Sequence, residues 1–368
     1  MISIAREILF HDKLRFTITV ASLGFAIVMI VYDIAMFYGV TSDSVALIDR
    51  SGADLWGAEE EARLNAPSEI PHRVAQRARS LEGVQQACAL DFSVGNLKID
   101  STSQVQIVGI DPACPMFQPW SLISGNAEDL RRKDTIIIDD LALRNGSQAS
   151  LGEEVELNGQ DLRLVAITQD NKSFSYPFVY VNLDTFEKLT GNPGMINFVA
   201  VQLEPGANLQ QIQAALSQST TDLTITPTQA FRSATINGMI AQGVGMIFVI
   251  VFIGILVGML TITLTMYTAT MEQLRDFAIL KALGATRLKI WGIVLEQTVT
   301  QTVAGFAIGL GASLGVDWLV ESASGIRGQF PIPAITACFM MMIVLSILGS
   351  LISIRKASQV DPVIVFRA

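Results

Sequence analysis

Histidine and cysteine, the residues that most often build metal sites and nucleophilic triads, are scarce in this sequence. Its 368 residues include three cysteines and two histidines, His11 and His72, which lie on either side of a long apolar run. The sequence also has no GxxxxGK(S/T) loop, so it does not bind ATP through that phosphate-cradling motif. It therefore predicts no catalytic residue, no metal site and no cofactor in this chain, and ATP-driven work would need a separate subunit.

Charged residues are few as well, at 16% of the chain, whereas 50% of the residues are apolar and the mean hydropathy is +0.45. Soluble domains rarely reach this balance. Four apolar runs are as long as the ~20 residues that a helix needs to cross the hydrocarbon core. We expect transmembrane helices at residues 16–40, 236–268, 290–319 and 332–354. The first run lacks a cleavage site and exceeds the ~15 apolar residues of a signal peptide, so we expect a retained anchor.

Basic residues flank these runs unevenly. They gather before the first run, between the second and third, and after the fourth, whereas the loop between the third and fourth has only Arg327. The positive-inside rule then predicts a multi-pass plasma (inner) membrane protein with both termini cytoplasmic. The cytoplasmic parts would be residues 1–15, 270–289 and 355–368, and residues 41–233 would be exported. The exported part has 25 acidic and 14 basic residues, which argues against binding nucleic acid.

The exported region alternates between strand and helix patterns. A strand near Ala53, a helix from Pro71 and two further strands form one early unit, and a strand, a helix and a strand over residues 197–227 form a late one. Between them, residues 111–195 hold short strands and turn residues. We therefore expect an α+β membrane protein with four transmembrane helices. Its large exported domain would combine a split βαβ subdomain with a β-rich insertion.

The second apolar run continues a helical pattern that begins upstream of the membrane. Thr226 and Pro227 are suited to the N-cap and the first helical position. A single helix over residues 227–280 would be much longer than the bilayer is thick. Part of it is therefore expected to stand outside the membrane as a stalk.

Cysteine and glycine positions suggest how parts of the chain are held together. Cys88 and Cys114 both lie in the exported region, where they could form a disulfide or remain as two unpaired core residues. The apolar runs contain glycines four residues apart, a spacing that lets membrane helices approach closely. These pairs fit packing within one protomer at least as well as dimerisation, and the ones that we assign to helix packing are Gly254, Gly258, Gly305 and Gly309.

The segment MEQLRDFAILKALGATRLKI, residues 271–290, lies between the second and third runs and is too short and too polar to span a bilayer. It has the pattern of an amphipathic helix that Gly284 would end, and Thr286 is placed to cap the helix that follows. One interpretation is a connector that lies on the membrane surface. The other is a docking site for a cytoplasmic partner.

This segment resembles the ERxxEIGxxxAxGA string of the FtsX-like permease family, the membrane subunits of MacB-type ABC systems. The resemblance is carried by Glu272, Arg275, Asp276, Ile279, Ala282, Gly284 and Ala285. Glu296, one turn into the next helix, and the terminal Asp361, Pro362 and Arg367 also resemble the family. Residues 246–361 would be the FtsX-like permease domain and the exported part a MacB-like core domain. The DPACPMFQPW loop and the chain length look most like the DevC branch.

The resemblance implies a homodimer embedded in membrane lipids and bound to two copies of an ABC ATPase subunit, which would bind the ATP. The chain itself would be a permease of an exporter, without enzymatic activity, and a membrane-fusion protein is a further expected partner. Residues 270–289 would be the coupling helix that passes ATPase-driven motion to the exported domain. Its expected contact residues are Glu272, Arg275, Asp276, Phe277, Ile279, Leu280, Lys281, Ala282, Leu283, Gly284 and Ala285.

Two other functions remain open at this point. An FtsX-like regulatory transducer would activate an extracytoplasmic partner instead of moving a substrate, although its exported domain is generally smaller than this one. A membrane sensor or enzyme unrelated to ATP is the other, and the missing catalytic constellation argues against it. The sequence does not identify the substrate.

Overall fold

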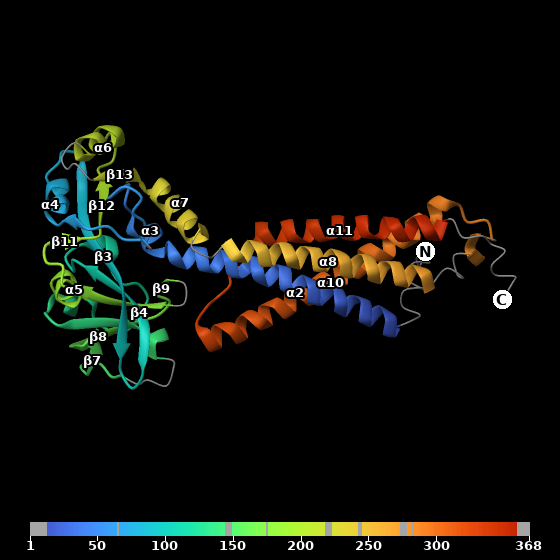
Figure 1. Cartoon of the computed structure of the whole chain (residues 1–368), viewed down its shortest axis with the longest axis horizontal. Helices are drawn as coiled ribbons and strands as arrows, with labels where there is room; N and C mark the ends of the chain where they lie inside the picture. The colour runs from blue at the N-terminus through green and yellow to red at the C-terminus, as the bar shows by residue number, and fades with distance from the viewer. Residues whose placement is uncertain are drawn as a thin grey trace. The chain divides into compact units, whose positions relative to one another are not determined.

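The computed structural model describes residues 13–64, 66–143, 149–173, 176–217, 223–241, 245–272, 278–281 and 283–358. The chain forms two compact units. One consists of Met1–Gly39 with Gly245–Ala368 and is helical, and the other is Val40–Val244, which holds the strands (Figure 1). Residues 1–12, 273–277, 282 and 359–368, which include part of the expected coupling helix and tail, lie outside the described residues.

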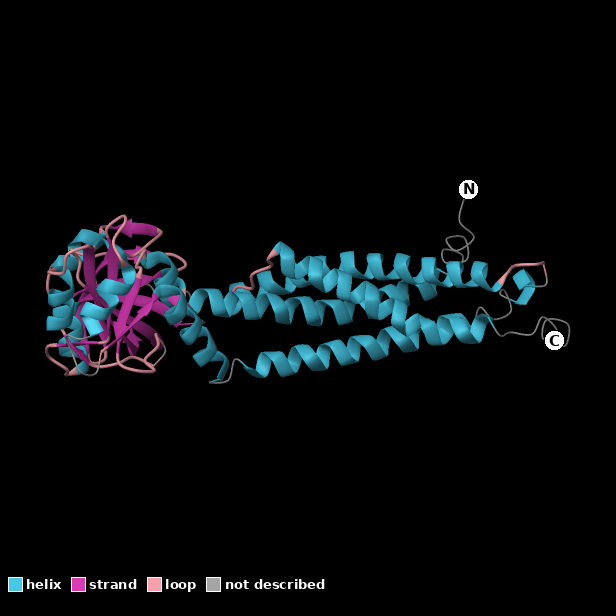
Figure 2. Ribbon diagram, turned by 90° about the horizontal axis from the view of Figure 1, so that it is seen from above, coloured by secondary structure: helices cyan, strands magenta, loops and turns pink. Residues whose placement is uncertain are grey.

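The helical unit is built from four long helices that run side by side (Figures 1 and 2). They are α2 (Lys13–Ser44), α8 (Gly245–Glu272), α10 (Arg287–Ser324) and α11 (Ile332–Ser358). Among the described residues, three stretches are long and apolar enough to cross a membrane, namely Phe16–Ser44, Leu288–Ser324 and Ile332–Leu351. On α8 the corresponding apolar stretch is the shorter Phe252–Thr261. The unit therefore has helices able to span a membrane, and a fourth span on α8 stays a prediction.

Of the helix expected over residues 227–280, the described residues show α7 (Thr228–Met239) and α8. Residues 242–244, between these two helices, lie outside the described residues. Pro227 is the N-cap and not the first helical residue, because Thr224–Pro227 is a strand that pairs with Leu55–Ala58. The strand hydrogen bonds hold this backbone extended, and the helix begins only after them.

One large sheet forms the frame of the other unit, with strand order β13-β1-β12-β3-β4-β10-β6-β8-β5. Its strands are β1 (Leu55–Ala58), β3 (Val84–Lys98), β4 (Thr102–Ile110), β5 (Leu122–Gly125), β6 (Thr135–Asp139), β7 (Glu154–Leu157), β8 (Gln160–Thr168), β9 (Lys172–Ser173), β10 (Tyr176–Asn182), β12 (Phe198–Leu203) and β13 (Thr224–Pro227). The short strands β2 (Ile70–Pro71) and β11 (Met195–Ile196) form a second, two-stranded sheet.

Six of these strands close into a ring. β7 pairs with both β3 and β8, and so completes the circuit β3-β4-β10-β6-β8-β7. All six strands supply the buried apolar residues of one cluster, which includes Leu97, Ile107, Ile138 and Val179. The β-rich part of the domain is therefore a small barrel filled by side chains. It takes two of its walls, β3 and β4, from sequence that precedes the expected insertion at 111–195.

The two strand, helix, strand units lie on the other part of the sheet. Helices α4 (Arg73–Arg79) and α6 (Leu209–Ser217) cover one face of β13, β1, β12 and β3. Side chains alternate between faces as strand geometry requires. Ala87 and Val199 pack under the helices, whereas their neighbours Cys88 and Phe198 belong to the cluster on the opposite face.

That opposite face is covered by the segments at either end of the domain. Trp56, which is fully buried, stacks on Phe231 of α7 at a ring-centroid distance of 4.8 Å and meets Phe117 edge to face. A disulfide joins Cys88 of β3 to Cys114, next to the 3₁₀ turn η1 (Pro115–Phe117). The loop that carries Phe117 is therefore attached covalently to the central strand.

Two buried carboxyl groups predict a pH-dependent stability of this domain. Burial raises the pKa of Asp91 to about 7 and that of Asp139 to about 7. The pKa of each group is higher in the folded state than its unfolded value, near 3.8. The contribution of each group to the stability of the fold is therefore fully present below the unfolded pKa and is lost as the pH rises through about 7. Between about pH 4 and pH 7, each group should lower the free energy of unfolding by up to about 1.4 kcal/mol per pH unit.

We therefore expect wild type to lose stability relative to the Asp91→Asn variant as the pH is raised over this window, measured by thermal unfolding. Asparagine keeps an oxygen to accept the 2.8 Å hydrogen bond from the Asn197 amide. The exposed Asp161 provides the control, since Asp161→Asn should follow the wild-type profile. Parallel pH profiles of the unfolding temperature for wild type and Asp91→Asn would contradict the raised pKa of Asp91.

Candidate functional site

The segment between α8 and α10 is the candidate site for a partner, and we call residues 270–289 the connecting segment. Helix α8 is described as far as Glu272, and the described residues 278–281 are helical. Of the expected contact residues, Arg275, Asp276, Phe277 and Ala282 lie outside the described residues. The other seven are Glu272, Ile279, Leu280, Lys281, Leu283, Gly284 and Ala285.

Gly284 ends the helical turn in the way that the sequence predicts. Its φ is +93°, in the left-handed region that glycine adopts without steric cost. The Gly284 amide donates to the Lys281 carbonyl at 3.0 Å and the Ala285 amide to the Leu280 carbonyl at 2.9 Å. These two hydrogen bonds form a Schellman motif, which satisfies the last carbonyls of the helix.

The next helix starts two residues later. The Thr286 hydroxyl accepts a hydrogen bond from the Lys289 amide at 3.4 Å, and α10 begins at Arg287. The N-cap expected at Thr286 is thus confirmed. A helix end and a helix start are joined by a turn of very few residues, so the direction of the chain is fixed by hydrogen bonds on both sides of Ala285.

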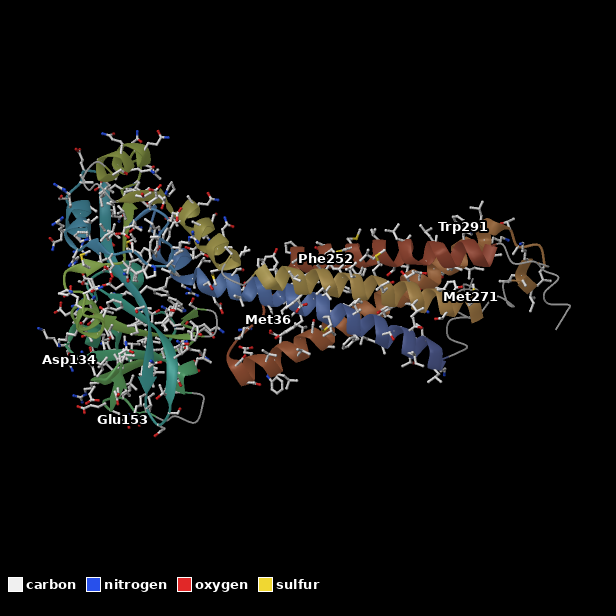
Figure 3. All side chains as sticks on the ribbon, viewed as in Figure 1. Met36, Asp134, Glu153, Phe252, Met271 and Trp291 are labelled. Atoms are coloured by element: carbon white, nitrogen blue, oxygen red, sulfur yellow. A yellow bond between two sulfur atoms is a disulfide. The ribbon has the colours of Figure 1, made fainter. Side chains whose placement is uncertain are left out.

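The described part of the connecting segment has one buried and one exposed side. Leu280 packs against Ile290 and Val294 of α10, which are 0% and 2% exposed. Four large apolar side chains point outward instead, and we call them the apolar face: Ile279 (42% exposed), Leu283 (79%), Leu288 (81%) and Trp291 (38%). Figure 3 shows Met271 and Trp291 at the same end of the helical unit, opposite Met36 and Phe252. An apolar patch of this kind usually marks a contact with a protein or a membrane.

Leu288 and Trp291 were not among the residues expected from the sequence. They belong to the first turn of α10, beyond the Gly284 turn, whereas the expected contact residues end at Ala285. Their spacing of three residues on one helix face is the signal that could have identified them. Leu283 lies on the other side of the Gly284 turn.

The glycine pairs differ in what they contact. A Cβ added at Gly305 would lie 2.8 Å from the Cβ of Leu23, and one at Gly309 would lie 2.9 Å from the carbonyl oxygen of Gly24, so α10 approaches α2 closely here. Added Cβ atoms at Gly254 and Gly258 would make ordinary contacts of 3.5 and 3.4 Å with Ile30 of α2. The close approach that requires glycine is therefore at Gly305 and Gly309, within one chain.

The buried acids of the strand-rich unit are held by hydrogen bonds within the domain. The described residues of the chain contain no group of three or more potential metal ligands. The carboxylate of Asp139 instead accepts hydrogen bonds from the Asn171 amide at 2.7 Å and the Leu141 amide at 3.1 Å. This buried acid therefore holds two loops of the barrel in place. His72 occupies the N-cap position of α4 without a capping hydrogen bond from its side chain, and His11 lies outside the described residues.

Comparison with known families decides the identity of the chain. Residues 16–219 match the MacB-like periplasmic core domain, and residues 248–362 match the FtsX-like permease C-terminal domain. The chain belongs to the MacB/FtsX family of ABC transporter permeases. The first match covers more than half of the permease, and the second covers the connecting segment and the helices on both sides of it.

Individual relatives are distant. An uncharacterized ABC transporter permease of Methanocaldococcus jannaschii is 25% identical over 59% of this chain and 57% of its own length, and YknZ of Bacillus subtilis is 24% identical over 58% and 56%. The permease thus spans less than two thirds of these two relatives. A permease of Mycobacterium tuberculosis is 23% identical over 95% of both chains. Among solved structures, the periplasmic region of MacB from Actinobacillus actinomycetemcomitans is similar at 14% identity, with a TM-score of 0.41, over 50% of this chain and 93% of that one.

The packing of α10 on α2 predicts unequal effects of the same substitution along α10. Gly309→Val would force a side chain into Gly24 and Ile27, and overpacking of this kind costs about 1–3 kcal/mol. At Gly311, in contrast, an added Cβ meets no described atom within 4 Å. We expect Gly309→Val to lower the thermal unfolding temperature of the purified protein in detergent and Gly311→Val to leave it nearly unchanged. Equal shifts for both variants would argue against this packing.

Proposed function

We propose that the chain is the membrane subunit of an ABC exporter and that the connecting segment docks on a separate ATPase. In this proposal four helices span the inner membrane, both termini and the connecting segment are cytoplasmic, and Val40–Val244 is exported. The observation that carries the proposal is the apolar face, which consists of Ile279, Leu283, Leu288 and Trp291. ATP would be bound and hydrolysed by the partner.

The form of the apolar face supports docking into a groove. Leu283 and Leu288 lie on either side of the turn at Gly284, so two apolar side chains are presented by a backbone that is held by a Schellman motif and an N-cap. A preformed turn loses little conformational entropy on binding. Lys281 and Lys289 add positive charge next to this apolar surface. Apolar contacts with a few charges at the edge are the usual composition of a protein interface.

We also propose that two copies assemble side by side, one for each of two ATPase subunits. A groove of about 560 Å³ between α2 and α8 supports this part of the proposal. Gly254 lines the groove, and the exposed side chains of Phe25 (67%) and Val257 (50%) stand at its sides. Close packing of a helix against such a surface is a main source of association energy in lipid.

The route from the ATPase to the exported domain would run through α2 and α3. Helix α2 continues across the division between the two units, and α3 (Ala46–Ser51) follows it. Asp49 of α3 forms two hydrogen bonds, of 2.7 and 3.2 Å, with the guanidinium of Arg232 on α7. The neighbouring Arg50 lies 4.6 Å over the ring of Trp120. A displacement of α3 would therefore pull on both the α7 side and the barrel side of the domain.

Asp43, in the last turn of α2, adds a third contact. Its carboxylate is 3.7 Å from the ammonium group of Lys172, whose side chain is only 8% exposed. Lys172 follows Asn171, and the Asn171 side chain donates to the Trp120 carbonyl at 2.8 Å and accepts from the Tyr180 hydroxyl at 2.8 Å. The end of α2 is thus linked to the wall of the barrel. A membrane-fusion protein would be the partner that senses the resulting movement of the exported domain.

The docking proposal predicts a strong effect of polarity at Leu283. Because this side chain is 79% exposed in the chain alone, Leu283→Asp should fold and insert normally. Burying its unpaired carboxylate in the ATPase groove would cost about 3–5 kcal/mol. We expect Leu283→Asp to lose co-purification with the ATPase and its stimulation of ATP hydrolysis in proteoliposomes. Leu283→Met, which conserves the apolar volume, should retain both, and a fully active Leu283→Asp complex would refute the docking role.

The transmission route predicts that the charges of Asp49 and Arg232 can be exchanged. Both side chains are about 40% exposed, so the pair should contribute less than about 1 kcal/mol to stability. We expect Asp49→Arg or Arg232→Asp alone to reduce the ATP-dependent change in distance between spin labels on two exported domains. The double exchange should restore it, while binding of the ATPase stays normal throughout. No difference between the single and double variants would exclude this contact from the route.

A further inference from the structure

We propose that the exported domain has a binding groove for a small oxyanion, a phosphate ester or a carboxylate that also carries a hydrogen-bond donor. The groove has a volume of about 520 Å³ and is formed by four separate segments. They are the start of α4 with His72, the loop after β4 with Asp111, the end of η2 (Ala127–Arg131) with the following Lys133, and the turn from β10 into α5 (Leu183–Thr190). The inference does not depend on docking of the ATPase.

The position of the groove follows from the strand directions. β4 and β10 are adjacent and parallel, and their ends are in register at Ile110 and Asn182. The backbone leaves the sheet after both strands at this point, which produces a crevice at the carboxyl ends of β4 and β10. Crevices of this kind are the usual place for ligands in sheets with adjacent parallel strands. The volume is also within the range of small-molecule sites.

The walls of the groove are held by hydrogen bonds that exist without a ligand. Asn182 is 8% exposed, and its side-chain amide donates to the carbonyls of Leu130 and Arg132 at 3.1 and 2.9 Å. On the other side, the Asp111 carboxylate accepts from the Ala113 amide at 3.0 Å, and the disulfide of Cys114 fixes the same loop to β3. A preformed site of this kind binds with little ordering cost.

The charges around the groove favour an anion. Nearby carboxylates are already neutralised: Asp111 lies 3.3 Å from Arg79, and Asp134 lies 2.7 Å from Lys188. Within the described part of the chain, Arg131 and Lys133 have no carboxylate within ion-pair distance. Two free cations from the segment after η2 therefore face a groove in a domain that is otherwise acidic. Guanidinium and ammonium groups are the side chains that bind phosphate and carboxylate most strongly.

Asp184 is the second carboxylate of the groove and defines the rest of the ligand. It lies in the first turn of α5, and among the described residues it has no ion-pair partner. A bare anion would be repelled by this side chain, whereas a hydroxyl or ammonium group beside the oxyanion could donate to it. The positive charges of Arg131 and Lys133 and the negative charge of Asp184 together select a small molecule in which an oxyanion and a hydrogen-bond donor are close to each other.

Binding can be measured on the full-length protein in nanodiscs of neutral lipid by isothermal titration calorimetry. The probes are glycerol 3-phosphate and glycerate, which present a phosphate and a carboxylate beside the same hydroxyl groups, and glycerol, which has no anion. We expect saturable binding of one or both anions and none of glycerol. Binding of one anion alone would identify whether phosphate or carboxylate is preferred. No saturable binding of either would overturn the proposal.

Substitutions then test the location of the site. Arg131→Gln combined with Lys133→Gln should weaken binding by about tenfold to a hundredfold, because two charge-assisted hydrogen bonds are removed. Arg132→Gln is the matched control, since Arg132 lies between them in sequence but pairs with Asp129 at 3.3 Å and does not line the groove. Asp184→Asn should reduce the preference for glycerol 3-phosphate over inorganic phosphate. An equal loss of binding in Arg132→Gln would indicate only general charge attraction and would refute the location of the site at Arg131 and Lys133.

Discussion

The pairing of the fifteen-residue strand β3 is the interaction on which the strand-rich unit Val40–Val244 depends. Along its length β3 bonds to β12, β4 and β7. Its first half is therefore a strand of the layer covered by α4 and α6, and its second half is a wall of the barrel. Because side chains alternate along a strand, Ala87 and Ala89 contribute to one core while Cys88 and Leu90 contribute to another. A break in β3 would separate the two halves of the domain and remove the wall to which the Cys114 loop is attached.

This shared strand explains which features could be predicted from the sequence. The apolar runs, the strand, helix, strand units and the turn at Gly284 are local patterns, and the structure has them near the expected residues. Closure of the barrel depends on the pairing of β7 with Leu97 and Lys98. These segments are distant in sequence, and local periodicity does not encode a contact between them. The same reason separates Leu288 from the expected contact residues. Leu288 follows the Gly284 turn and lies outside the family motif.

The start of the stalk helix has a similar origin. The sequence predicts one helix, because the apolar period and the cap residues are compatible with it. The strand β13 competes for the first residues, and its four backbone pairings with β1 prevail over the helical preference of Thr226 and Pro227. Phe231 then stacks on Trp56 and commits α7 to the core of the strand-rich unit. Tertiary contacts therefore decide where the helix begins.

Tertiary contacts also distinguish the positions of one helix, α10. On α10, an added Cβ would lie 2.8 Å from the Leu23 Cβ at Gly305 and 2.9 Å from the Gly24 carbonyl oxygen at Gly309, whereas Gly311 and Gly315 meet no described atom within 4 Å. At the start of α10, Ile290 and Val294 anchor the connecting segment while Leu288 and Trp291 remain exposed. The close approach of Gly309 to Gly24 and Ile27 therefore fixes where α10 packs on α2, whereas the exposed residues at the start of α10 leave that packing unchanged.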